Sequence, residues 1–147
     1  MAIEGTATTE IEAPIERVYE VAADVEGSPR WQPEIKRAEV LERDDDGNQV
    51  LVHTEADGKV RTLHTTLRFS YDEPTGLSWR QEEGDLKAVE GSWVFEDLGD
   101  GRTRATYSMS TDLGRMLGMV IRGPLVDLLR RQLVTSMPGK LKGFVES

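Results

Sequence analysis

The chain of 147 residues contains no cysteine. Disulfides, thiolate zinc sites and cysteine nucleophiles are therefore excluded. Basic residues are also scarce, because 18 Lys and Arg stand against 27 Asp and Glu and leave a formal net charge of −9. A nucleic-acid binder needs a basic surface to contact phosphates, so we expect no nucleic-acid partner.

Long apolar runs are missing as well. The longest uncharged run in the apolar segment near the C-terminal half, residues 116–121, is far too short to cross a bilayer. Residues 1–10 lack the basic and apolar regions of a signal peptide. We therefore expect one cytoplasmic domain, residues 1–147, that does not insert stably into membranes.

The elements that the sequence does indicate begin with a strand and a helix. Residues 3–12 alternate between a face of small and apolar residues and a polar face, which predicts a β-strand. Pro14 suits the first position of a helix, and apolar residues then recur at helical spacing over 14–25. A glycine and two prolines break the chain after this helix, leaving at most a short helical turn around Trp31.

From residue 35 to residue 112 the apolar period changes to two, which is typical of strands. The connections carry turn chemistry, such as Asp46-Gly47 and Asp100-Gly101. Connections this short exclude a parallel sheet, which needs long crossovers. The pattern predicts an antiparallel meander with strands at 36–44, 48–56, 59–72, 77–84, 88–97 and 102–112.

The last part of the chain has a helical pattern. Gly123-Pro124 opens a helix whose apolar residues recur at helical spacing as far as residue 136. Pro138-Gly139 should kink or interrupt this helix, although the apolar pattern resumes at Leu141. The order of elements is thus strand, helix, six strands and helix, which indicates an α+β fold.

The strand register decides which side chains face inward. If Asp57-Gly58 is a two-residue turn, residue 54 pairs with residue 61. The inner face is then aromatic and bulky, but it carries more polar groups than a solid core holds, because each unpaired one costs ~1–3 kcal/mol. We favour an apolar pocket with a few polar groups over hydroxyls that bond to backbone or water at the sheet ends. The polar inward residues are Thr9, Thr54, Arg61, Thr65, Tyr71, Gln81 and Tyr107.

Three motifs resemble those of a known superfamily. The string IEAPIERVY at Ile11–Tyr19 is similar to the "I-x-A-P-x-x-x-V-aromatic" opening of the START-like helix-grip (SRPBCC) superfamily. Asp24 followed by SPRWQP at Ser28–Pro33 resembles a segment of its polyketide cyclase/dehydrase branch. Gly84–Phe95 resembles that branch's "G-x-x-K-x-x-x-G-x-W-x-F" strand. The superfamily also contains coenzyme Q-binding proteins and the birch-pollen allergen group.

The resemblance implies a helix-grip fold, in which a curved seven-stranded antiparallel sheet wraps around a long C-terminal helix in the order β-α-β6-α. It also implies a cavity between the sheet and that helix. Members of the superfamily bind lipids, sterols, quinones or polyketides there, and some catalyse cyclisation or dehydration. The Pro138-Gly139 pair departs from the regular C-terminal helix of the family.

Candidate ligand-binding residues come from the predicted inner face, the segment after it and the last helix. Trp31 and Trp79 offer flat apolar walls to a ring-bearing ligand, whereas core packing is the stronger expectation for Trp93. An inward Arg61 either pairs with an acidic ligand group or reaches water at the mouth of the sheet. We predict that the ligand contacts Trp31, Thr54, Arg61, Thr65, Leu67, Tyr71, Trp79, Gln81, Trp93, Tyr107, Met109, Met116, Leu125 and Leu129.

His53 and His64 are the two histidines of the chain, and the register places both on the outer face. No HExxH pattern or supporting carboxylate motif accompanies them, so we predict no metal site. The chain also has no GxSxG, Walker or Rossmann motif, and we expect no cofactor. A register slip of one residue would bring one histidine inside.

Residues 113–122 form an unusually apolar connection before the last helix. A Met-rich stretch punctuated by glycines suits a movable lid or portal over a hydrophobic ligand. A fixed plug packed on the first helix and a partner interface are the alternatives. Because the stretch from Arg115 to Arg122 is basic in an acidic chain, we expect a ligand or partner to enter there.

Three functions follow from these patterns. The favoured one is binding of a hydrophobic, ring-bearing small molecule (a lipid, quinone or polyketide) as a carrier or sensor. The first alternative is a polyketide cyclase or dehydratase, in which Arg61, Tyr71 and Tyr107 polarise and orient the substrate. The second is an adaptor that binds a partner through residues 113–122. The catalytic residues, the identity of the ligand and the choice between monomer and homodimer stay open.

Overall fold

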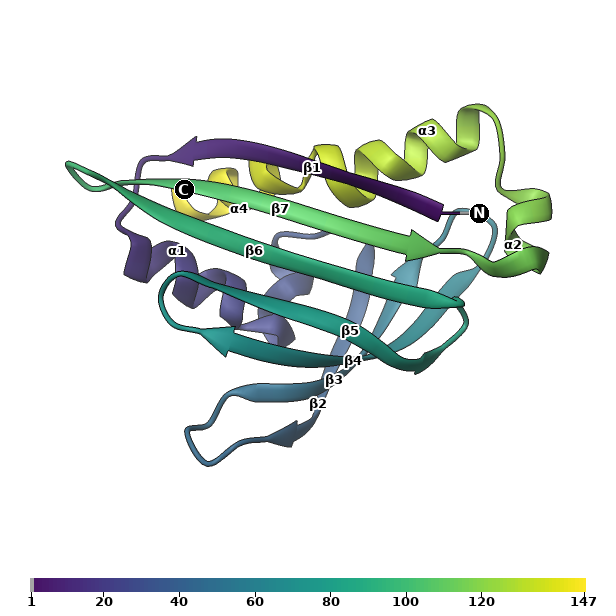
Figure 1. Ribbon diagram of the computed structural model, residues 1–147, viewed down its shortest axis with the longest axis horizontal. Helices are drawn as coiled ribbons and strands as arrows, with labels where there is room; N and C mark the ends of the chain where they lie inside the picture. The colour runs from purple at the N-terminus through teal and green to yellow at the C-terminus, as the bar shows by residue number, and fades with distance from the viewer. Residues whose placement is uncertain (1) are drawn as a thin grey trace.

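Seven antiparallel strands form one curved sheet in the computed structural model, which describes residues 2–147 (Figure 1). The strand order is β1-β7-β6-β5-β4-β3-β2, so β1 (Ala2–Ile11) pairs with β7 (Arg102–Asp112) and the rest follow as a meander. The predicted α+β fold and all seven predicted strands are confirmed. The other strands are β2 (Ile35–Arg43), β3 (Gln49–Asp57), β4 (Thr62–Asp72), β5 (Gly76–Gly84) and β6 (Ala88–Gly99).

The β3–β4 hairpin departs from the predicted register. Asp57 pairs with Thr62, so four residues connect the two strands where the sequence predicts two. Thr54 consequently pairs with Thr65. Because the pairing shifts by an even number of residues, the inward side chains of β4 are the predicted ones. The inward orientation predicted for Arg61 is wrong, because this residue lies in the connection and is exposed.

The first helical segment follows the prediction with shorter bounds. The helix α1 spans Ile15–Ala23 and buries one apolar face. Pro14 is its N-cap, whereas the sequence predicts Pro14 as the first helical residue. A 3-10 helix, η1 (Val25–Arg30), continues the chain toward Trp31. Asp24 caps η1, because its Oδ1 accepts a hydrogen bond from the N–H of Gly27 at 3.3 Å.

The C-terminal segment consists of four pieces, where the sequence predicts one interrupted helix. The apolar connection contains a short helix, α2 (Gly114–Val120), and α3 (Pro124–Arg130) begins at the predicted proline. A π-helix, η2 (Arg131–Thr135), then leads into α4 (Met137–Val145). Figure 1 shows α3 and α4 in line beside β1, with α2 at one end and α1 at the other. Within residues 2–147, no helix is long and apolar enough to cross a membrane.

Pro138 explains where the last helix is interrupted. Proline has no N–H to donate and its ring clashes with the carbonyl four residues earlier, so a regular α-helix cannot run through it. The irregular turn falls just before Pro138, where the N–H of Ser136 bonds to the carbonyl of Arg131 at 2.8 Å in the i→i+5 pattern of a π-helix. The predicted interruption is confirmed, one turn earlier than Pro138-Gly139.

Two apolar clusters hold the sheet against the helices. The larger one joins α1, α4 and the sheet and includes Val18, Phe95 and Leu141. The smaller one joins α2 and α3 to the starts of β1 and β4 and includes Leu63 and Leu117. The candidate site is lined by members of both clusters.

Candidate functional site

An apolar cavity of about 140 Å³ lies between the inner face of the sheet and the helices. Its walls come from strands β2 to β7 and the loop between β5 and β6, from α1 and η1, from the loop before β2, and from Leu133 and Met137 of the C-terminal segment. A cavity of about 150 Å³ accommodates benzene, so this one holds about one ring as it stands. A ligand with several rings would have to displace side chains.

Aromatic rings from adjacent strands form one wall of the cavity. Trp79 of β5 lies against Gly91 of β6, where any Cβ would collide with the indole. The ring centroids of Trp93 and Tyr107 are 4.7 Å apart, and those of Trp79 and Tyr107 are 5.7 Å apart. Every second residue of a strand faces inward, so these rings share one surface that suits a flat apolar ligand.

Glu34, in the loop before β2, brings a carboxylate to this apolar wall. Its side chain is 2% exposed, and its Oε2 lies 2.9 Å from Nζ of Lys140 in α4. Its Oε1 has no hydrogen-bond partner among the described residues. Since a carboxylate oxygen can accept from a ligand donor, Glu34 is both paired with a cation and open to a ligand.

The π-helix supplies a second partner for Lys140. In an α-helix the carbonyl of Gln132 would accept from the N–H of Ser136, but that N–H bonds to Arg131. The Gln132 carbonyl instead accepts from Nζ of Lys140 at 3.0 Å. The irregular turn before Pro138 thus helps to place the cation that faces Glu34.

Tyr107 contributes a hydroxyl that stays protonated. Burial, and after it the charge of Glu34, raise the pKa of the Tyr107 hydroxyl well above its ordinary value. This hydroxyl donates to Sδ of Met109 at 3.3 Å, and a thioether is a weak acceptor. Tyr107 can therefore redirect its proton to a ligand oxygen at little cost.

Further polar atoms of the cavity residues lack partners. Nε1 of Trp31 and Oγ1 of Thr111 are buried without a hydrogen bond among the described residues. Most buried polar atoms in proteins are paired, so several orphans around one apolar space indicate a place for a ligand or for water. Together with Glu34 and Tyr107, they offer both donors and an acceptor.

More than half of the predicted ligand-contacting residues meet in this cavity. They come from the loop before β2 and from five strands, and their side chains or backbone line the same space. These residues are Trp31, Thr54, Thr65, Leu67, Trp79, Trp93, Tyr107 and Met109.

The other predicted polar contacts lie elsewhere. Arg61 is exposed and its Nη2 lies 3.4 Å from Oδ2 of Asp85. The Tyr71 hydroxyl donates to the carbonyl of Gln49 at 2.6 Å, and burial raises its pKa. Nε2 of Gln81 donates to the carbonyl of Leu86 at 2.8 Å. None of these three predicted residues lines the cavity.

Three predicted apolar contacts are also absent from the cavity wall. Leu129 is a member of the second apolar cluster and Leu125 packs against it. Met116 is 83% exposed, on the outside of α2. The part of the C-terminal segment that borders the cavity is η2 and the start of α4, through Leu133 and Met137. The three predicted residues belong to α2 and α3 and lie outside it.

Residues that the sequence does not single out complete the site. Glu34 carries no local sign of burial, because its ionic partner Lys140 is 106 positions away. The sequence could have predicted Thr111 as a cavity residue, because it follows Tyr107 and Met109 at every second position on the inner face of β7.

The helix α2 covers one end of the cavity. Leu63 lines the cavity and belongs to the apolar cluster that contains Leu117 of α2. This cluster contains no residue of α1, so the alternative of a plug on the first helix is wrong. Gly114, the first residue of α2, and Gly123, which follows the helix, have φ values of 78° and 63°, which favour glycine.

The sequence of the chain is similar to a family model and to a known protein. The family model described as "Polyketide cyclase / dehydrase and lipid transport" matches residues 11–137. A curated protein of Streptomyces halstedii, "Putative polyketide cyclase", is 29% identical over 93 residues, which are 62% of this chain and 85% of that protein.

Solved structures share the whole fold. A START superfamily protein from Mycobacterium smegmatis has a TM-score of 0.83 and 22% identity, with 97% of each chain covered. The Zhui aromatase/cyclase from Streptomyces sp. R1128 has a TM-score of 0.75 and 21% identity, with 99% of this chain and 94% of that chain covered. These likenesses confirm the helix-grip fold.

Proposed function

Because the chain belongs to the polyketide cyclase/dehydrase and lipid transport family, we propose that it binds a hydrophobic, ring-bearing small molecule in the cavity as a carrier or sensor. The observation that carries this proposal is an aromatic-walled cavity bordered by buried polar atoms without partners. Apolar walls with a few polar groups are the usual composition of small-molecule sites.

The polar atoms specify what the ligand carries. Oε1 of Glu34 accepts, whereas the Tyr107 hydroxyl and Nε1 of Trp31 donate. A ligand with a hydroxyl beside a carbonyl on a flat ring satisfies both kinds of group. A quinone without hydroxyls offers acceptors alone and leaves Oε1 of Glu34 without a donor, which costs binding energy. The arrangement favours a phenol or enol next to a ketone, as in a partly cyclised polyketide.

The ligand enters beneath α2. The cavity end at Leu63 and Leu86 is closed by apolar packing of α2, which begins at one glycine, Gly114, and is followed by another, Gly123. The exposed apolar residues Met116 and Met119 sit on its outer side, where they meet an approaching hydrophobic molecule first.

A fluorescence titration tests the binding proposal. We expect a hydroxynaphthyl ketone, whose second ring displaces cavity side chains, to quench tryptophan emission. A quinone of the same size or a saturated fatty acid should bind at least tenfold more weakly. Gly91→Ala pushes the Trp79 indole into the cavity and should weaken binding of the ketone at least tenfold.

The matched control is Gly139→Ala, because a Cβ at Gly139 meets nothing within 4 Å. Binding by this variant should equal that of the unchanged protein. Equal affinity of the Gly91→Ala variant, or no binding by any member of the panel, would contradict the proposal.

Glu34 and Tyr107 also support a second candidate function, a cyclase or dehydratase. Glu34 would take a proton from the carbon between two carbonyls, and the resulting enolate carbon would form a bond to a third carbonyl carbon. Tyr107 would donate a hydrogen bond to the oxygen of that carbonyl as it gains charge. The proton that Glu34 removed would then pass to this oxygen, and loss of the resulting hydroxyl together with a proton from the neighbouring carbon, as water, would complete a dehydration.

The enzyme hypothesis is tested by separating binding from turnover. Glu34→Gln keeps the shape of the side chain but removes the base, so product formation from a poly-β-carbonyl thioester should fall about 10²- to 10⁴-fold. Binding of the hydroxynaphthyl ketone should change much less. If the unchanged protein binds that ketone but forms no product, the chain is a carrier or sensor.

A further inference from the structure

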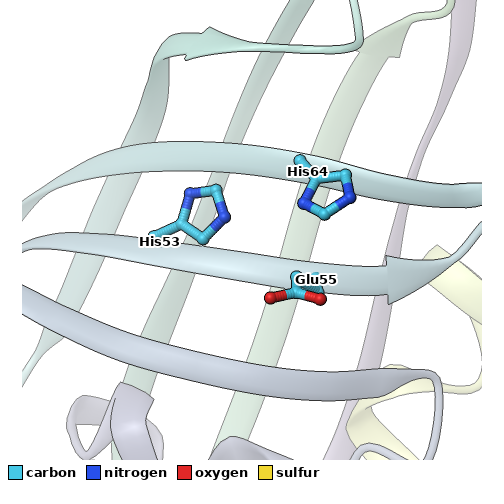
Figure 2. Close-up of side chains that lie close together, drawn as sticks. All are labelled: His53, Glu55 and His64. Atoms are coloured by element: carbon cyan, nitrogen blue, oxygen red, sulfur yellow. The ribbon is translucent and has the colours of Figure 1, made fainter.

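Two histidines and a glutamate meet on the outer face of the sheet, on the side away from the cavity (Figure 2). His53 and Glu55 are two residues apart on β3 and therefore face the same side, and His64 on β4 pairs with Glu55. The imidazole rings of His53 and His64 stack with centroids 5.8 Å apart. One ligand atom from each residue lies within 4.8 Å of the other two.

We propose that His53, Glu55 and His64 bind a divalent transition-metal ion of the zinc class. Ligand atoms of tetrahedral zinc lie about 3.3 Å apart, so these side chains need to close by about 1.5 Å at most. His64 is exposed and the other two are half-buried, so rotation about their side-chain bonds permits this closure. Three protein ligands leave the fourth position for water or for a group from another molecule.

The ligand types select the class of metal. Imidazole nitrogen suits zinc, copper, nickel and cobalt, whereas magnesium and calcium prefer sites made of oxygen alone. Two histidines with one carboxylate therefore favour the first group. Cysteine is absent from the chain, so no thiolate site competes for the same ions.

A neighbouring hydroxyl already orients one of the ligands. A ring nitrogen of His53, Nδ1, lies 3.0 Å from Oγ1 of Thr66, which is itself 6% exposed. A histidine that bonds through one nitrogen presents the other to a metal, and such outer partners set the ring orientation. Thr66 is therefore a positioning residue for this site.

The surrounding charges favour a cation. Glu39 of β2 lies opposite His53 of β3 in the strand pairing. Oδ2 of Asp85 accepts from the backbone N–H of His64 at 2.8 Å. Arg37 competes for Glu55, since its Nη1 lies 3.4 Å from Oε2 of Glu55, and Arg61 already pairs with Oδ2 of Asp85 at 3.4 Å. The second terminal nitrogen of Arg37, Nη2, pairs with Oε2 of Glu39 at 2.5 Å, so Arg37 can release Glu55 and keep its ion pair with Glu39.

Calorimetry with zinc chloride tests this proposal on the full chain without an added histidine tag. After treatment with a chelator, the protein should bind one zinc ion. His53→Gln, Glu55→Gln and His64→Gln should each weaken binding at least tenfold. Thr66→Val should weaken it about 10- to 100-fold through the loss of ring orientation.

Glu90→Gln is the matched control, because Glu90 is an exposed carboxylate on β6, outside the cluster. Its zinc affinity should be unchanged, and all variants should keep the circular dichroism of the folded protein. Cobalt should give visible bands that the His64→Gln variant loses. If all three ligand variants bind zinc as tightly as the unchanged protein, the proposal is overturned.

Discussion

The two ends of the C-terminal segment are held against the sheet by different forces. At the α4 end, charged side chains reach across to other elements. Lys140 pairs with Glu34, and Nζ of Lys142 donates to the carbonyl of Glu10 at 2.9 Å. Oε2 of Glu146 accepts from the N–H that precedes α1, at residue 12, at 2.8 Å.

At the other end α2 depends on apolar packing. Leu117 and Ile121 are buried in the smaller cluster, while Met116, Met119 and Val120 are exposed. Among residues 2–147, no ion pair joins α2 to the sheet. Its polar contact with the sheet is made at its first residue, where the N–H of Gly114 donates to Oδ1 of Asp112 at the end of β7 at 2.9 Å. Directional polar contacts specify one arrangement, whereas apolar packing tolerates several, so α4 is the anchor and α2 is the part able to move.

The largest effect is expected when the anchor loses its charge. Lys140→Met keeps the apolar stem but leaves the carboxylate of Glu34 buried without its cation. Breaking a buried pair from one side costs about 3–5 kcal/mol, so the free energy of unfolding in urea should fall by that amount. Adding Glu34→Gln to the same chain should recover part of the loss.

Lys87→Met provides the control for this prediction. Lys87 is 73% exposed and its Nζ lies 4.0 Å from Asp112. Exposed pairs contribute about 0–1 kcal/mol, so this variant should remain close to the unchanged protein. Equal losses from Lys87→Met and Lys140→Met would refute the view of Lys140 as an anchor.

A matched pair of leucine substitutions sharpens the comparison. Leu141 in α4 is 0% exposed and Leu117 in α2 is 9% exposed. Leu141→Ala should cost near the upper end of about 2–5 kcal/mol in unfolding, and Leu117→Ala near the lower end. Hydrogen exchange should show faster exchange of α2 amides alone in the Leu117 variant. Faster exchange of α4 in that variant would show that the two ends move together.

The smallest effect concerns acid sensitivity at the end of α4. The N–H of Glu12, and then Lys142, hold the pKa of the Glu146 carboxyl below its ordinary value of 4.5. A lowered pKa stabilises the fold above the ordinary value, and this contribution disappears as pH falls through the lowered pKa.

Glu146→Gln should therefore be less stable than the unchanged protein at neutral pH. When thermal unfolding of the two proteins is compared, their difference in stability should shrink as pH falls below the ordinary pKa of Glu146 and vanish below the lowered one. A difference that grows toward acid pH would contradict the assigned cause of the shift.

The sheet is the part of the molecule that the sequence predicts best. Alternation and glycine-containing turns mark every strand, and an even slip in the β3–β4 pairing leaves the inward residues of β4 unchanged. Because of the same shift in pairing, the sequence does not predict the proposed metal-binding cluster of His53, Glu55 and His64. The predicted two-residue turn sets His64 opposite Leu51, whereas the observed pairing sets it opposite Glu55.

The polar part of the cavity is predicted less well. Arg61, Tyr71 and Gln81 have the right chemistry, but loop length and nearby backbone carbonyls decide where their polar groups go. Glu34 lies in a loop among polar residues, and its burial depends on Lys140 at the far end of the chain. Local patterns contain no information about a pair so distant in sequence.

The π-helix has a consequence for the counting of residues along the last helix. An i→i+5 turn accommodates one residue more than an α-helical turn, and each residue of an α-helix turns the chain by about 100°. Deleting one residue from 131–135 would remove the extra residue of this turn and rotate everything after it by about 100°. Lys140 would swing away from Glu34, and Leu141 would leave the core. The extra residue thus sets the phase in which α4 meets the sheet.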